Sequence, residues 1–79
     1  MKNLSAVLPN GTRATRKTDR PYTHICAIRI TDIPTGKVGT WWAQWSQTES
    51  GAAKMARSWQ TCPAAKDGKI TVETQVIPL

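Results

Sequence analysis

The sequence has 79 residues, enough for one domain with one small core and too few for a doubly wound nucleotide-binding sheet or a barrel enzyme. Apolar residues make up 39% of the chain and four residues are Trp, which favours a folded domain over a disordered chain. The 11 Lys and Arg outnumber the 5 Asp and Glu, so the formal net charge is +6. Such an excess favours partners that carry phosphate groups, anionic membranes or acidic protein patches.

The positive charge is concentrated near the N-terminus. Residues 1–20 carry five cationic residues against Asp19 alone, a net charge of +4. We therefore expect a single domain, residues 1–79, in which residues 1–21 form a basic N-terminal hairpin or arm and residues 22–79 form a core of sheet and helix. The simpler explanation of the charge is a solvated face that keeps a small protein soluble.

The composition also predicts the compartment and the absence of a metal. The apolar stretch Leu4–Leu8 is far too short for a secretory signal or a membrane span, so we expect a cytoplasmic protein with no membrane partner. In a reducing compartment Cys26 and Cys62 stay as thiols, and a disulfide between them would require export. Together with His24 they are too few for a four-ligand zinc site, and we expect no metal and no cofactor.

The first predicted element is a hairpin centred on Pro9-Asn10-Gly11. Asn-Gly supplies the positive φ angles of a tight turn between two strands. Leu4–Leu8 and Thr12–Thr18 would be the two strands. Because Thr12–Thr18 lacks apolar alternation, a mobile basic arm is an equally good interpretation of this segment.

A second hairpin follows, and it is richer in apolar residues. Tyr22–Thr31 is a predicted strand with one nearly apolar face, formed by Tyr22, His24, Cys26, Ile28 and Ile30. After a turn at Pro34-Thr35-Gly36, its predicted partner strand runs from Val38 to Gln44 or Trp45. Trp41 and Trp45 point to one side of that partner and Trp42 to the other. One face therefore packs in the core while the other leaves an indole partly exposed, and the pattern does not decide which.

A helix is predicted next. Ser46-Gln47-Thr48-Glu49 is typical of a capping box, and the helix that follows should have about fourteen residues and end before Pro63. Its apolar face consists of Ala52, Met55, Ala56 and Trp59, and its opposite face of Lys54, Arg57 and Ser58.

The last predicted element is the strand Ile70–Ile77, which alternates between apolar and polar residues after a turn at Lys66–Lys69. The fold class is therefore α+β: an antiparallel sheet of three to five strands with one helix packed on one face, in strand–strand–helix–strand order, with an extra N-terminal hairpin. The other sheet face would be open to water or to a partner. An exposed edge strand allows either a monomer or a homodimer.

Catalytic chemistry finds little support in the sequence. His24 and Cys26 lie on one strand face and could form a base and a nucleophile, but they stand in the most apolar row of the chain, which favours core packing. Each acidic residue has a local structural role available, and the glycines occur singly, so there is no phosphate-binding glycine loop. We expect the protein not to be an enzyme.

The most informative functional feature is the tract Thr12–Tyr22, which places four cations among hydroxyls and ends in an aromatic residue. Arg and Thr together are good ligands for phosphate, and Arg29 could extend the patch. Two hypotheses follow: docking on a host protein or nucleoprotein complex, or binding of DNA or RNA through the phosphate backbone. The candidate macromolecule-binding residues are Arg13, Arg16, Lys17, Arg20, Arg29, Trp42, Lys54 and Arg57.

The layout resembles that of some small anti-CRISPR proteins of bacteriophages. The likeness lies in the segment Glu49–Trp59, which follows a hairpin and precedes a strand, and Arg16–His24 is similar to a run in phage reading frames. The resemblance implies a phage protein that inhibits a host CRISPR complex in the host cytoplasm, by steric occlusion or by capturing one conformation. Many such inhibitors are acidic DNA mimics, whereas this chain is basic. The implied target is therefore an acidic protein patch or a nucleic-acid-facing surface.

Overall fold

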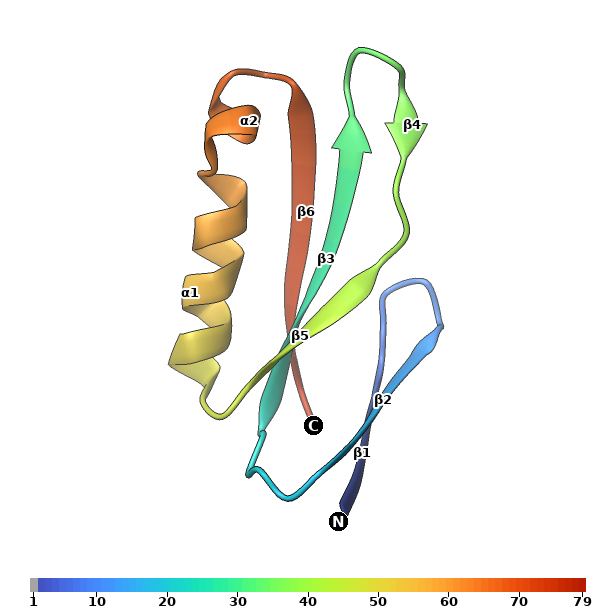
Figure 1. The fold of residues 1–79 in the computed structure, drawn as a ribbon, viewed down its shortest axis with the longest axis vertical. Coiled ribbons are helices and arrows are strands. Elements are labelled where there is room, and N and C mark those ends of the chain that lie inside the picture. The colour runs from blue at the N-terminus through green and yellow to red at the C-terminus, as the bar shows by residue number, and fades with distance from the viewer. Residues whose placement is uncertain (1) are drawn as a thin grey trace.

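The computed structural model describes residues 2–79 and confirms the predicted α+β class (Figure 1). A two-stranded antiparallel sheet, the β1–β2 hairpin, accompanies a four-stranded sheet that carries the helix α1. Within this part of the chain no helix is long and apolar enough to cross a membrane. The elements are β1 (Lys2–Val7), β2 (Arg13–Thr18), β3 (His24–Asp32), β4 (Lys37–Val38), β5 (Trp42–Ser46), α1 (Glu49–Gln60), α2 (Pro63–Lys66) and β6 (Ile70–Pro78).

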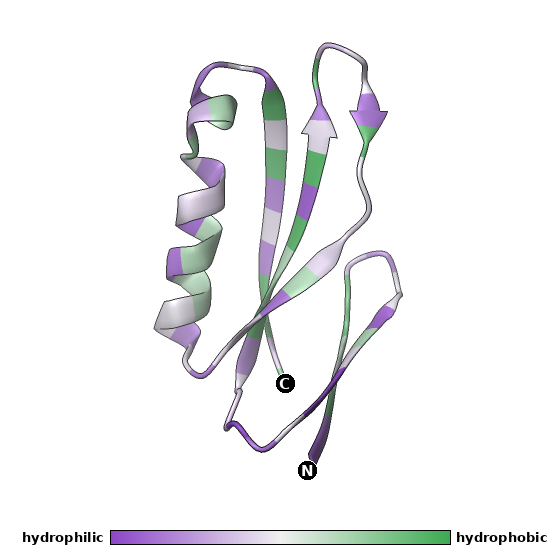
Figure 2. Ribbon diagram, viewed as in Figure 1, coloured by the Kyte–Doolittle hydropathy of each residue, from purple (hydrophilic) through white to green (hydrophobic). Residues whose placement is uncertain are grey.

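Strand β3 is the centre of the larger sheet. It pairs antiparallel with β6 along one side and with β4 and β5 along the other. Helix α1 therefore connects two strands, β5 and β6, that run in the same direction on opposite sides of β3. Figure 2 shows that hydrophobic and hydrophilic residues alternate along β6, as expected for a strand that packs against another layer through only one face.

Both faces of β3 are buried, which corrects the prediction of one open sheet face. Ile25, Cys26, Ala27 and Ile28 are all 0% exposed. Cys26 and Ile28 lie toward α1, whereas Ile25 and Ala27 lie toward the β1–β2 hairpin. The apolar face opposite the helix would be unfavourable in water, and the hairpin covers it with Ala6 and Leu8, which are almost completely buried.

The second strand pair contains a β-bulge, so the predicted continuous strand Val38–Trp45 is wrong. Thr31 pairs with Val38 and Ile28 pairs with Trp42, which leaves three residues on one strand opposite two on β3. A Cβ atom at Gly39 would lie 2.6 Å from the carbonyl oxygen of Ile30, so the backbone approaches too closely for any other residue. The bulge separates β4 from β5.

The start of α1 also differs from the prediction. The N-cap is Thr48, whose hydroxyl accepts a hydrogen bond from the Gly51 amide at 3.0 Å. Ser46 belongs to β5, is buried, and bonds instead to the backbone of Thr48. A Cβ at Gly51 would lie 2.6 Å from the Ser46 hydroxyl, which explains the glycine in the first turn. The capping box at Ser46–Glu49 is therefore wrong by two residues.

The packing face of α1 is as predicted. Ala52 is fully buried, and Met55, Ala56 and Trp59 pack with it against β3, β5 and β6. The helix ends at Gln60, shorter than expected, and the short helix α2 follows from Pro63. Helix α2 was not predicted, because four residues give no helical periodicity.

Candidate polyanion-binding surface

The outer face of the β1–β2 hairpin carries two exposed cations, Arg13 and Lys17. Arg13, Thr15 and Lys17 alternate with Ala14, and Ala14 packs against the core beneath the hairpin. Successive side chains of a strand point to opposite faces, so Arg13, Thr15 and Lys17 point away from the sheet. Neither Arg13 nor Lys17 forms an ion pair within residues 2–79.

Cross-strand pairing brings polar groups from β1 onto the same face. Ser5 pairs with Thr15 and Asn3 pairs with Lys17. Directly opposed side chains in an antiparallel pair lie on the same side of the sheet. We call this surface the basic hairpin face; its members are Asn3, Ser5, Val7, Arg13, Thr15 and Lys17.

The two cations of the basic hairpin face are held well apart. Four residues along a strand correspond to about 13 Å. Phosphates recur every ~3.4 Å of axis along one strand of duplex DNA, so Arg13 and Lys17 are suited to two separate phosphate groups. The hydroxyls of Ser5 and Thr15 lie between them as short hydrogen-bond donors.

Arg16 lies on the opposite face of β2, the face of Ala14, and is oriented by an aromatic ring. Its guanidinium carbon is 5.1 Å from the centroid of the Tyr22 ring, a cation–π contact. Tyr22 in turn lies 6.1 Å from Trp45, centroid to centroid. A shallow hollow of about 430 Å³ adjoins Arg16, and it is lined by Asn3, Leu4, Ser5, Thr15, Arg16 and Lys17. Arg20 follows β2 in an exposed loop.

Arg29 does not add free charge to this surface. Its Nη2 donates to the two carboxylate oxygens of Glu73 at 2.6 and 2.7 Å, and its Nε donates to one of them at 3.2 Å. The guanidinium also lies 5.1 Å above the Trp41 ring. Because Glu73 neutralises Arg29, the prediction that it extends the basic patch is not supported by the geometry.

The remaining candidates lie on the other side of the sheet. Trp42 packs on the α1 side, where its ring meets Trp59 edge to face at 5.5 Å. It is therefore not an exposed anchor beside the hairpin. Lys54 and Arg57 are exposed on α1. The eight predicted residues thus fall on two opposite surfaces instead of one.

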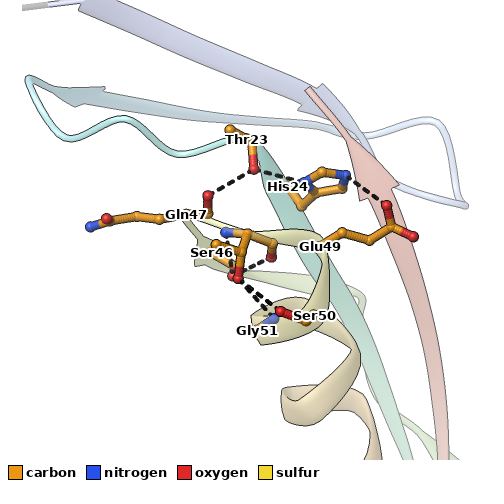
Figure 3. A network of polar contacts seen from close by, with 8 residues as sticks. Thr23, His24, Ser46, Gln47, Glu49, Ser50 and Gly51 are labelled. Atoms are coloured by element: carbon orange, nitrogen blue, oxygen red, sulfur yellow. Dashed lines mark hydrogen bonds and ion pairs between the residues drawn. The ribbon is translucent and has the colours of Figure 1, made fainter.

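A polar network at the start of β3 has a structural role (Figure 3). The Thr23 hydroxyl donates to the Gln47 carbonyl at 3.0 Å, and it lies 2.7 Å from the Nδ1 atom of His24. Since the hydroxyl hydrogen is used toward Gln47, Nδ1 must be the donor to Thr23. Nε2 of His24 lies 3.9 Å from a Glu49 oxygen. The network connects β3, the end of β5 and the first turn of α1.

Cys26 is separate from that network. It is fully buried on the α1 side, and burial raises the pKa of its thiol above the ordinary value. A raised pKa keeps the sulfur protonated and unreactive at neutral pH. Within residues 2–79 no three His, Cys, Asp or Glu side chains are grouped as a metal site.

Asn3 and Ser5 were not among the predicted site residues. The predicted two-residue turn at Asn10-Gly11 would have placed Ser5 opposite Arg16. In the structure Leu8 pairs with Thr12 across the three-residue loop Pro9–Gly11, in which only Gly11 has a positive φ, and this register places Ser5 opposite Thr15. The chain matches no protein-family model, no curated protein and no solved structure.

Proposed function

We propose that the protein is a non-enzymatic binding module whose hairpin binds the phosphate backbone of nucleic acid. The observation that carries the proposal is the pair of unneutralised cations, Arg13 and Lys17, on either side of the Ser5 and Thr15 hydroxyls. Backbone contacts of this kind supply affinity that depends on charge and not on sequence. Arg16, on the other face of β2, and Arg20, in the loop that follows β2, would add further contacts beside this face.

The indoles are partly buried and none of them lies on the basic hairpin face, which favours nucleic acid over a protein partner at this face. Strong protein–protein sites centre on exposed Trp, Tyr and Arg anchors. Here Trp41 and Trp45 pack in the cluster under the hairpin, and Trp42 and Trp59 pack under α1. The basic hairpin face itself carries only polar side chains, cations and Val7.

The alternative is inhibition of a host defence complex in the cytoplasm, in the manner of an anti-CRISPR protein. It rests on the resemblance in layout described above. In this case the basic hairpin face would meet an acidic patch of the complex or its bound nucleic acid. Both proposals use the same cations, so they differ in the partner and not in the surface.

The test is a titration of the purified protein with duplex DNA, single-stranded DNA and single-stranded RNA at several salt concentrations. Four phosphate contacts predict that the logarithm of the affinity falls with the logarithm of salt concentration, with a slope of about −3 to −4. Replacing Arg13, Arg16, Lys17 and Arg20 together by Ala should abolish binding while circular dichroism stays unchanged, because all four side chains are exposed.

The matched control replaces Lys66 and Lys69 by Ala. Both are exposed; Lys66 is the last residue of α2 and Lys69 directly precedes β6, and Figure 1 shows α2 far from the β1–β2 hairpin. If the control lost as much affinity per charge as the hairpin variant, only net charge would matter and the assigned surface would be wrong. Absence of binding to all three nucleic acids, with a single host complex captured through the same four residues, would select the alternative.

A further inference from the structure

A groove separates α1 from β5 on the sheet face opposite the hairpin. Its volume is about 510 Å³, and it is lined by Gln44 of β5 together with Gly51, Lys54, Met55, Ser58 and Trp59 of α1. Figure 1 shows α1 alongside β6 while β5 runs obliquely away from the helix. The side chains of Met55 and Trp59 give the groove an apolar floor.

Strand β5, whose Gln44 lines this groove, is an edge strand of the four-stranded sheet. Within residues 2–79 β5 pairs with β3 alone, because β1 and β2 form a sheet of their own. Half of the β5 backbone N–H and C=O groups therefore point outward without a strand partner. An added strand would lie about 4.8 Å away, and every second side chain would point to the α1 face, into the groove.

The polar groups around the groove favour an acidic partner. Gln44 accepts a hydrogen bond from the Trp59 indole N–H at 3.0 Å, which fixes its side chain and leaves its amide nitrogen available to donate. Every buried side-chain nitrogen and oxygen in the described chain has a partner, so this nitrogen is accessible to solvent. Lys54 lines the groove and Arg57 lies one turn further along α1. Neither cation forms an ion pair within residues 2–79.

We propose that this groove is a second binding site, which takes an extended acidic peptide as an added strand on β5. The peptide backbone pairs with the β5 edge, one apolar side chain contacts Met55 and Trp59, and a neighbouring carboxylate pairs with Lys54. An edge strand beside a helix is a recurrent way to bind peptides, in which backbone pairing supplies affinity and a side-chain pocket supplies selectivity. The site is independent of the basic hairpin face, since it lies across the sheet from it.

The probe is an acetylated and amidated octapeptide of Thr residues with a central Leu and a Glu two positions to each side of it. A matched peptide carries Lys in place of Glu, and a third carries N-methyl groups on alternate backbone amides. Binding to the full chain is followed by amide chemical shifts in ¹⁵N–¹H correlation spectra. The acidic peptide should shift the signals of residues 42–46 and 54–59 and leave those of β1 and β2 in place.

Variants of the chain test the assignment further. Lys54→Glu should weaken the acidic peptide by about two- to fivefold and strengthen the Lys peptide, as expected for one exposed ion pair. Ser58→Phe should block the groove and abolish binding. Lys66→Glu is the matched control, since it makes the same charge change outside the groove. The variant with four Ala substitutions in the hairpin should bind the peptide normally, which separates this site from the nucleic-acid proposal.

The proposal is overturned if the N-methylated peptide binds as well as its parent, because strand addition requires the backbone amides. It is also overturned if Lys66→Glu weakens binding as much as Lys54→Glu, or if none of the peptides shifts the β5 signals at millimolar concentration. Unchanged circular dichroism of Lys54→Glu, whose side chain is exposed, ensures that loss of binding is not loss of the fold.

Discussion

Replacing Leu8 by Ala should lower the free energy of unfolding by about 2–3 kcal/mol. Leu8 is only 5% exposed and forms a cluster with Ala6, Ile25 and Ala27 beneath the hairpin. Leu→Ala substitutions in protein cores cost about 2–5 kcal/mol, and the value rises with the cavity that remains. The lower half of that range applies here, because a two-stranded hairpin lying on a sheet can settle into part of the space.

Urea unfolding monitored by Trp fluorescence measures this cost. With a denaturant slope of about 1 kcal/mol per molar urea, the midpoint should fall by about 2–3 M. The matched control is Val7→Ala in the same hairpin, where the side chain is 52% exposed and the expected change is within about 0.5 kcal/mol. Equal losses for the two variants, or a loss below about 0.5 kcal/mol for Leu8→Ala, would refute the docking of the hairpin on the sheet.

Three further predictions concern the bulge, the helix and the buried thiol. Gly39→Ala should destabilise by about 1–3 kcal/mol through the clash with β3, whereas its neighbour Thr40→Ala, which is exposed, should change urea stability by less than about 0.5 kcal/mol. Trp59→Ala should cost about 3 kcal/mol and Trp59→Phe about 1 kcal/mol in the same assay; an unchanged stability of Trp59→Phe would mean that the indole N–H bond contributes nothing. Because burial raises the pKa of Cys26, its contribution to stability is complete below the unfolded value of 9.0 and is lost as pH rises toward the folded value. Wild type should therefore lose more urea stability than Cys26→Ala between about pH 8 and 10, and equal losses would contradict this assignment.

Local sequence patterns correctly predicted the elements that pack against only one other layer of the fold. The alternation in β6 and the spacing of Ala52, Met55, Ala56 and Trp59 identify faces that pack against a single layer, and both are as expected. The Asn-Gly turn likewise predicted the first hairpin as one of two alternatives. These features are determined within about a dozen residues of sequence.

Features that depend on distant parts of the chain were not predictable in the same way. The odd positions of β3 include Ile25 and Ala27 but also Arg29, so they do not form a continuous apolar row. The sequence therefore did not predict a second layer packed on that face of β3. The bulge arises from the close approach of Gly39 to another strand, which leaves only a lone glycine as a signal. Thr48 displaces Ser46 as the helix cap because Ser46 is already used in β5.

For the candidate site, the sequence identified the cations but not their environment. Arg29 and Arg13 are the same residue type. Arg29 nevertheless pairs with a carboxylate on the neighbouring strand, whereas Arg13 is exposed to water. The partner of Arg29 lies on β6, and only the antiparallel register places Glu73 opposite it. Lys54 and Arg57 are separated from the hairpin because α1 and the hairpin cover opposite faces of β3.

The pairing of β3 with β6 has a consequence for the order in which the molecule assembles. Its ladder joins Ile25 to Ile77 and Asp32 to Ile70, so a large loop must close before the central strand gains that neighbour. Folds dominated by such distant pairings acquire their native state in roughly milliseconds to seconds, whereas an isolated hairpin forms in about 1–10 microseconds. The β1–β2 hairpin can thus form and unfold many times before the sheet face on which it packs has formed. Pairing of β3 with β6, rather than formation of the β1–β2 hairpin, then determines how fast the protein reaches its native state.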